Sequence, residues 1–170
     1  MGGRRRRSRG PQINGWLIVD KPAGITSTGV CNAVKRLAGG AKAGHGGTLD
    51  PLATGVLPIA LGEATKTVPY VMDGQKTYRF TVRWGEARNT DDAEGVVIET
   101  SDHRPEQAAI EAVLPQFVGL IDQVPPIFSA IKVDGARAYD LARDDQKVEL
   151  QSRQIQIFSL RLEDIPDEDH

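Results

Sequence analysis

Residues 75–84 alternate strictly between apolar and polar side chains, and this pattern constrains the fold more than any other in the chain. The run TYRFTVRW at residues 77–84 places Tyr78, Phe80, Val82 and Trp84 at every second position. Because successive side chains of a strand point to opposite faces of a sheet, a period of two predicts a strand with one buried face. The alternation therefore predicts a strand over residues 75–84.

Other segments predict strands and helices in mixed order. Strands are predicted at residues 13–20, 56–61, 96–99, 118–122, 128–133 and 155–162, the last with a phase slip at Phe158. Helices are predicted from a cap at Thr26 or Ser27 to residue 37, and at 63–72 (disturbed by Pro69), 105–117 and 136–143. Loops are expected at 39–47 and 88–94 and a turn at 134–135. Because the elements form no regular βαβ alternation, they favour an α+β fold with a mixed, mainly antiparallel sheet and flanking helices.

Length and cysteine content indicate the class of protein. The chain has 170 residues, 39% of them hydrophobic, which is enough for one domain with a core. A single cysteine, Cys31, excludes an internal disulfide framework and fits a reducing compartment. No apolar run is long enough for a signal peptide or a membrane span, so we expect no membrane partner and a cytoplasmic location.

Charge is divided unevenly along the chain. Residues 1–66 contain ten Lys and Arg and three Asp and Glu, whereas residues 67–170 contain eleven and twenty. Five of the arginines lie within residues 1–11, which we expect to form a basic flexible arm that either reaches for phosphate or is a solvated tail. Residues 163–170 contain five acids and no Lys or Arg, and we expect a frayed end there.

The segment GHGGTLDPLATG at residues 44–55 presents a lone carboxylate, Asp50, on a turn. Glycine costs backbone entropy and Pro51 fixes φ, which suits a tight turn or a close approach to another molecule. A carboxylate in this setting can serve as a general base or a covalent nucleophile. Asp-Pro is also a common way to begin a turn, so both interpretations stay open at this point.

Several other kinds of site do not fit the sequence. The spacing Gly39 to Gly44 begins a phosphate-binding loop, but His45-Gly46 follows where Lys-Ser/Thr is needed, and the dinucleotide pattern ends on Leu49. The histidines and Cys31 have no metal-ligand spacing, so we expect no metal. The nucleophile elbow of serine hydrolases is absent.

Four segments carry a resemblance to a known family: NGWLIVDKPAGITS at 14–27, AGHGGTLDPLATGVLPIALGEATK at 43–66, KTYRF at 76–80 and PPIFSAIKVDGARAYDLAR at 125–143. Over residues 12–162 the chain resembles the tRNA pseudouridine synthase B (TruB) family. The resemblance implies a pseudouridine synthase fold and conversion of the T-arm uridine at tRNA position 55 to pseudouridine. It also implies that no cofactor is needed.

The resemblance also implies roles for individual residues. Asp50 matches the essential aspartate, His45 the histidine beside the flipped-out nucleotide, and Tyr78 the tyrosine that stacks on the base and is implicated in removing the C5 proton. From periodicity alone, Tyr78 is more simply a core tyrosine. The remaining expected substrate-binding residues are Lys66, which should contact RNA backbone, Asp92, which should order its loop, and Lys21, Thr48 and Gly46.

The chain also departs from the family pattern. Asn89 and Glu94 stand where aspartate is usual, and the chain ends before a K-G-T-Y-I-R strand whose arginine pairs with the catalytic aspartate. From this we expect residues 12–162 to be the N-terminal portion of a catalytic domain, incomplete at its C-terminus and without a PUA domain. The alternatives are a catalytically incompetent RNA-binding or tRNA-folding fragment, which the missing segment could complete in trans, and an unrelated phosphate-binding domain. By itself the chain is expected to bind tRNA weakly with little turnover.

Overall fold

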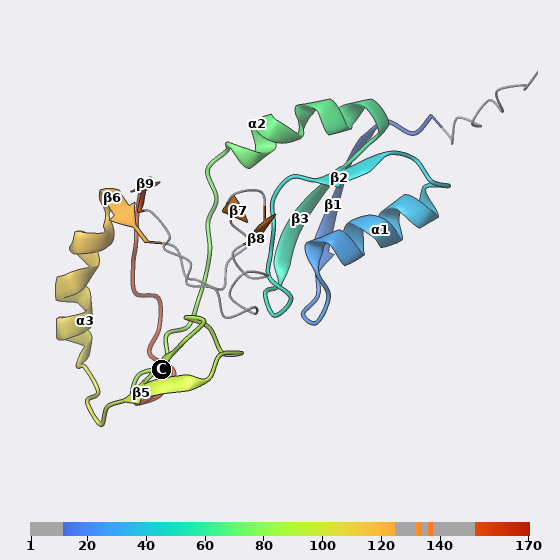
Figure 1. The fold of residues 1–170 in the computed structure, drawn as a ribbon. Coiled ribbons are helices and arrows are strands. Elements are labelled where there is room, and N and C mark those ends of the chain that lie inside the picture. Colours follow the sequence, from blue (N-terminus) through green and yellow to red (C-terminus); the bar gives the residue numbers. More distant parts are fainter. Residues whose placement is uncertain (1–11, 125–131, 134–135, 138–151) are drawn as a thin grey trace, which may run out of the picture. The chain divides into compact units, whose positions relative to one another are not determined.

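The structure is a computed structural model that describes residues 12–124, 132–133, 136–137 and 152–170. It divides into two compact units, Met1–Tyr78 and Arg79–His170 (Figure 1). The predicted basic arm, the turn at 134–135, and the greater parts of the strand predicted at 128–133 and the helix predicted at 136–143 lie outside the described residues.

The first unit is built on a three-stranded antiparallel sheet in the order β1-β3-β2. These strands are β1 (Gly15–Lys21), β3 (Gly55–Leu61) and β2 (Ala43–His45). The β1–β3 register runs from Gly15 opposite Leu61 to Lys21 opposite Gly55, and His45 of β2 lies opposite Ile59. The central strand therefore ties together the end of β1 and the end of β2, the two places from which the candidate site is built.

Helix α1 (Ser27–Leu37) packs on this sheet because its ends and its apolar face are well defined. The Thr26 side chain accepts a hydrogen bond from the Gly29 N–H at 2.9 Å, and basic residues in the last turn complement the helix dipole. Its apolar face buries Val30, Cys31 and Val34 against the sheet residues Leu57, Ile59 and Leu61. Burial raises the pKa of the Cys31 thiol, so Cys31 is a core residue rather than a reactive one.

The helix predicted over residues 63–72 is two short elements. A 3₁₀ helix, η1 (Gly62–Thr67), leads directly into α2 (Val68–Met72). Pro69 lies in the first turn of α2, where its missing N–H would have had no intrahelical partner. None of the helices in the described residues is long and apolar enough to cross a membrane.

In the described residues of the second unit, the strands form three antiparallel pairs and the helical residues form one short segment. The pairs are β4 (Glu86–Arg88) with β5 (Val97–Thr100), β6 (Gly119–Gln123) with β9 (Arg153–Ile157), and β7 (Lys132–Val133) with β8 (Ala136–Arg137). Helix α3 (Gln107–Val113) continues into the 3₁₀ helix η2 (Leu114–Phe117). Together the two units confirm the α+β class and the antiparallel pairing, although the described strands form four small sheets rather than one.

The strand predicted over residues 75–84 is wrong. No regular structure covers 75–83, and Tyr78 and Phe80 are 65% and 66% exposed. Alternation marks a surface that could be half-buried, but a strand also needs a neighbour to pair with, and no described strand pairs with this segment.

Three further elements differ from the expected ones. Strand β2 lies inside the predicted loop 39–47, because pairing with β3 rather than local composition makes it a strand. Likewise, Ala136–Arg137 is a strand, β8, where a helix was predicted. The last strand ends at Ile157, just before the phase slip at Phe158.

The acidic segment 163–170, expected to fray, contacts its own unit through Asp169. The Asp169 carbonyl oxygen accepts a hydrogen bond from the Trp84 N–H at 2.8 Å, and the Asp169 carboxylate accepts one from Arg104 Nε at 2.7 Å. A backbone bond and an ion pair at the same residue hold this end of the segment against residues 84 and 104.

Candidate active site

Asp50 lies on the loop that joins β2 to β3. The loop leaves β2 at His45, and the Gly46 N–H donates a hydrogen bond to the Pro58 carbonyl at 2.8 Å. The Asp50 carbonyl closes a turn by accepting from the Ala53 N–H at 3.1 Å, while its side chain is exposed. The Asp50 carboxylate therefore projects from a loop that is fixed to the central strand β3 at its beginning, through Gly46, and continues into β3 at its end.

The half-buried His45 ring has a defined orientation, because Nδ1 hydrogen bonds to the Gly47 carbonyl oxygen. A carbonyl can only accept, so Nδ1 carries the proton. In the neutral ring Nε2 is then an acceptor. The loop thus fixes the tautomer of the histidine that precedes Asp50.

Gly46 is required by contacts within the protein. It is buried, and a Cβ there would lie 2.9 Å from Val71 Cγ1 and 3.4 Å from Trp16 Cζ3. Its neighbours are therefore α2 and β1 side chains, which is a different reason for the glycine than the close approach of a ligand. Gly47 has φ +154°, and a Cβ added there would meet nothing within 4 Å, so the open side of the loop lies at this residue.

Ser27, the first residue of α1, anchors the loop just before Asp50. Its side chain is 2% exposed. The Oγ accepts a hydrogen bond from the Leu49 N–H and donates one to the Leu49 carbonyl, both at 2.9 Å. Leu49 itself packs against the core of the unit. The sequence suggested Ser27 only as a helix cap, because a contact 22 residues away along the chain leaves no local pattern.

Lys21 anchors the loop just after Asp50. It is the last residue of β1 and is 0% exposed. Its ammonium donates to the carbonyl oxygens of Pro22 at 3.0 Å, Pro51 at 3.2 Å and Ala53 at 2.5 Å. The Gly24 N–H donates to the same Pro51 carbonyl at 2.8 Å.

The Lys21 side chain has no exposed surface in this geometry, and its expected contact with substrate stays a prediction. A lysine has three N–H donors, and all three are used inside the protein by a side chain with no exposed surface. Lys21 is a positioning residue: it fixes the backbone at Pro51 and Ala53, while Ser27 fixes Leu49. Asp50 is thereby held between two anchors, and a side chain held this way needs little further ordering before it can meet a bound molecule.

We expect Ser27→Ala to loosen the loop measurably. The change leaves the Leu49 N–H and carbonyl without their partner, which should lower the free energy of unfolding by about 1–3 kcal/mol. Urea denaturation followed by circular dichroism measures this. Thr28→Ala, one residue along the helix and exposed, is the matched control. Equal urea midpoints for the two variants would contradict the anchoring role.

Of the other predicted residues in the first unit, one lies in this loop, and the described part of the chain shows no hydrogen bond or ion pair from Lys66 or Tyr78 to it. Thr48 is exposed within the loop itself. Lys66 is exposed on η1, where it pairs with Glu63. Tyr78 is exposed at the end of the first unit. The structure therefore brings His45, Thr48 and Asp50 together, and leaves Lys66 and Tyr78 as separate exposed side chains.

Asp92 lies in the second unit and orders the loop between β4 and β5. Its Oδ1 accepts hydrogen bonds from Thr90 Oγ1 at 2.6 Å and from the Glu94 N–H at 2.9 Å. Asn89 works alongside it, since its Oδ1 accepts from the Val96 N–H at 2.9 Å. Asp92 and Asn89 thus both accept hydrogen bonds from within this loop, and the role expected of Asp92 stays a prediction.

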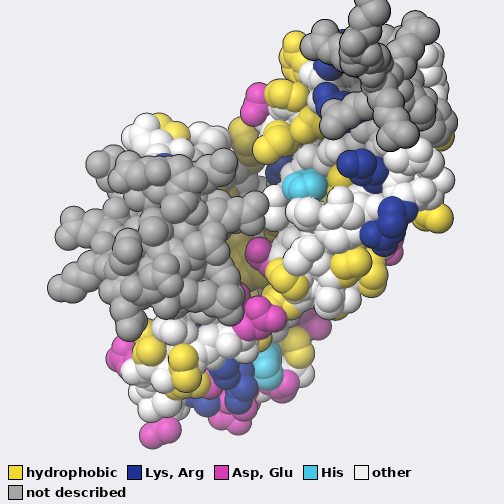
Figure 2. All heavy atoms as spheres, turned by 45° about the vertical axis from the view of Figure 1, so that its right-hand side comes forward, with side chains coloured by type: hydrophobic (Ala, Val, Ile, Leu, Met, Phe, Trp, Pro, Cys, Tyr) yellow, Lys and Arg dark blue, Asp and Glu magenta, His cyan; other side chains and the backbone are white. Residues whose placement is uncertain are grey.

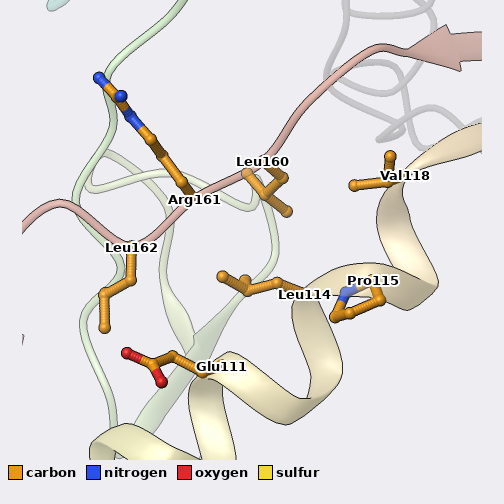
Figure 3. Close-up of a pocket in the computed structure, with 7 residues that line it drawn as sticks. All are labelled: Glu111, Leu114, Pro115, Val118, Leu160, Arg161 and Leu162. Atoms are coloured by element: carbon orange, nitrogen blue, oxygen red, sulfur yellow. The ribbon is translucent and has the colours of Figure 1, made fainter.

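A hollow of about 560 Å³ in the second unit is lined by none of the predicted site residues. Figure 3 shows its apolar side chains facing one another, whereas Arg161 points away from them. Its lining comes from α3, η2, the residue that follows η2 and the segment after β9: Glu111, Leu114, Pro115, Val118, Leu160, Arg161 and Leu162. The residues that the structure describes contain no group of three or more His, Cys, Asp or Glu placed to hold a metal ion.

Comparison with known proteins decides the family. The family model for the TruB family pseudouridylate synthase N-terminal domain matches residues 35–170. The chain belongs to the TruB family. It is 61% identical to a protein named tRNA pseudouridine synthase B from Brucella anthropi over 98% of this chain, and 66% identical to one of the same name from Rhodospirillum rubrum over 92%.

These matches cover nearly all of this chain but only part of each relative. The chain spans 51% of the length of each of these two curated relatives. Among solved structures, one titled "Crystal Structure of a Cbf5-Nop10-Gar1 Complex" matches 93% of this chain and 37% of that chain, with a TM-score of 0.58 and 26% identity. The fold of the TruB chain therefore agrees with that of a solved protein over nearly its whole length.

Proposed function

We propose that this chain is the part of a tRNA pseudouridine synthase that carries the catalytic aspartate, acting on the T-arm uridine at tRNA position 55. The observation that supports this most directly is an exposed Asp50 carboxylate on a loop anchored on both sides, in a chain of the TruB family. Residues 12–162 would form the N-terminal portion of the catalytic domain. A tRNA substrate also implies a cytoplasmic location.

The proposed reaction is an isomerisation that balances without any other reactant. The C1′–N1 bond of uridine breaks and a C1′–C5 bond forms, while a proton leaves C5 and one is gained at N1. The Asp50 carboxylate acts as the nucleophile: it holds the detached fragment of the uridine in a covalent bond. This bond breaks again when the C1′–C5 bond forms. The uridine must first leave the base stack, as in other enzymes that act on a base.

The neighbours of Asp50 suit a flipped-out nucleotide. His45, with its Nδ1–H committed to Gly47, can use Nε2 as an acceptor toward the ribose or base. Thr48 is exposed in the same loop and can donate its hydroxyl hydrogen. Tyr78 offers an exposed ring, which can stack on the target base.

The experiment that tests this function follows the C5 hydrogen. Full-length protein is incubated with an unmodified tRNA transcript labelled with tritium at uridine C5, and tritium released to water is counted. Release should correspond to one uridine per tRNA, and a transcript with cytidine at position 55 should release none. A tRNA that binds at micromolar protein but never loses its label would overturn the proposal in favour of a non-catalytic RNA-binding role.

We expect Tyr78→Phe to slow turnover while tRNA affinity changes little. The ring remains for stacking but the hydroxyl implicated in removing the C5 proton is lost, and lost acid–base groups typically cost about 10²–10⁴-fold in rate. Tyr78→Leu should also weaken binding, since stacking on an aromatic is worth about 1–3 kcal/mol per base. Single-turnover tritium release and filter binding measure the two effects.

Tyr70→Phe is the matched control for this tyrosine. Tyr70 is 80% exposed on α2 in the same unit, and its variant should behave like the unmodified protein. Normal single-turnover rates for Tyr78→Phe would show that its hydroxyl takes no part in the chemistry.

A further inference from the structure

Helix α2 is too short to keep its conformation without help from other residues. It has five residues, Val68–Met72, and an isolated helix of this length is unstable in water. The carbonyl groups in the last turn of a helix also have no partner within the helix. Contacts from outside α2 must therefore fix its end, and two of the residues that do so approach it at Val71.

The Val71 side chain fixes the end of α2 to the loop that carries Asp50. A Cβ added to Gly46 would lie 2.9 Å from Val71 Cγ1 and 3.3 Å from Val71 Cβ, so the two residues pack directly against each other. Gly46 is held in turn by its N–H, which donates to the Pro58 carbonyl of β3 at 2.8 Å. The last turn of α2 is thus in contact with the start of the Asp50 loop.

The Lys76 ammonium caps the carbonyl end of the same turn. It donates hydrogen bonds to the carbonyl oxygens of Val71 at 3.4 Å, of Gly74 at 2.6 Å and of Met72. Figure 2 shows Lys and Arg side chains recurring over the surface of the first unit, and such side chains ordinarily keep their charge in water. Lys76 instead uses its three donors on the backbone, as basic side chains do when they cap the end of a helix.

We infer that Lys76 is a positioning residue for Tyr78, which follows it by two residues. Two residues span at most about 7 Å, so the bonds that tie Lys76 to α2 restrict where the Tyr78 ring can lie. Because Val71 contacts Gly46, the same turn of α2 relates the position of Tyr78 to that of the Asp50 loop. The inference rests on the proposed function for the chemical role of Tyr78.

Removing these bonds should displace Tyr78 without removing a group that reacts. Lys76→Met keeps a side chain of similar length that cannot donate. The single-turnover rate of tritium release should fall by roughly 10- to 10²-fold, because displacing a reacting group by about 1 Å can cost that much. Lys76→Arg, which retains donors for the carbonyls, should restore most of the rate. Lys35→Met, which removes an exposed lysine from the last turn of α1, is the matched control and should react at the unmodified rate.

A double-mutant cycle distinguishes positioning of Tyr78 from a general loss of structure. In full-length protein that also carries Tyr78→Phe, Lys76→Met should cost several-fold less in rate than it does alone, because both changes act on the same hydroxyl. An equal loss of rate in the two backgrounds would overturn the inference, as would a normal single-turnover rate for Lys76→Met alone.

Filter binding across a series of KCl concentrations separates positioning from a contact with RNA. Lys76→Met should show the same slope of log tRNA affinity against log salt as Lys35→Met. A lost phosphate contact would instead reduce the slope by roughly 0.7–0.9. That reduction would assign Lys76 to the RNA backbone and overturn the inference.

Hydrogen exchange tests the anchoring of α2 without any turnover. The Asp73 N–H donates to the Pro69 carbonyl at 2.9 Å and the Gly74 N–H to the Val71 carbonyl at 3.3 Å. Both amides should exchange faster in Lys76→Met than in Lys35→Met, and unchanged exchange would contradict the anchoring. This measurement is independent of tritium release, so a failure here is distinguishable from a failure of the proposed isomerase activity.

Discussion

Replacing Asp50 with Asn is expected to abolish pseudouridine formation while tRNA binding persists. Asparagine keeps the shape of the side chain but removes its charge and nucleophilicity, so single-turnover tritium release should fall by about 10⁴-fold or more, as when other enzymes lose their nucleophile. The Asp50 side chain is exposed and is held through its backbone neighbours, so the loop should keep its conformation.

Asp73→Asn provides the control for this experiment. It removes an exposed carboxylate at the end of α2, in the same unit, with the same change in charge. Its rate and affinity should match those of the unmodified protein. Tritium release by Asp50→Asn within about ten-fold of that rate would remove Asp50 from the chemistry, since a lost nucleophile costs far more.

Replacing Lys21 with Met is expected to destabilise the first unit and release the loop. Methionine fills a similar volume but leaves the carbonyls of Pro22, Pro51 and Ala53 without their buried donor. The Pro51 carbonyl keeps its bond from the Gly24 N–H, whereas those of Pro22 and Ala53 lose the Lys21 donor, so the free energy of unfolding should fall by about 1–3 kcal/mol. Hydrogen exchange at the Ala53 and Gly24 amides should accelerate, because both bond to residues of the same turn.

The comparison that isolates this effect is Lys35→Met, which removes an exposed lysine and should change neither stability nor exchange. Lys21→Arg is also informative, since it retains the positive charge but brings a larger, planar head group to a fully buried position. Unaltered amide exchange at Ala53 in Lys21→Met would show that the loop is held without the lysine.

Elements with complete local signals were predicted well from the sequence. Helix α1 begins and ends at the predicted residues, because Thr26 caps it and its apolar face repeats with helical spacing. Strands β1 and β3 lie within two residues of the predicted 13–20 and 56–61. The turn at Asp50 was also evident, since glycine and proline restrict the backbone locally.

Features that depend on distant partners could not be predicted in this way. Strand β2 exists through its pairing with β3, and residues 75–83 lack a strand although their alternation is strict. The burial of Lys21 depends on carbonyls 30 and 32 residues further along the chain. A lysine at the end of a strand is ordinarily expected in solvent. Lys21 is buried because the loop that carries Asp50 brings the Pro51 and Ala53 carbonyls to its ammonium group.

The anchors of the Asp50 loop determine whether the loop loses its conformational entropy when the protein folds or when RNA binds. The bonds made by Lys21, Gly24 and Ser27 join residues 21–27 to residues 49–53, so the loop acquires its conformation when β1, α1 and β3 come together. The conformational entropy of this loop is lost on folding and not on association. Calorimetry of tRNA binding should accordingly show a heat-capacity change without a contribution from ordering the Asp50 loop, and any coupled ordering should arise from other segments or from the RNA itself.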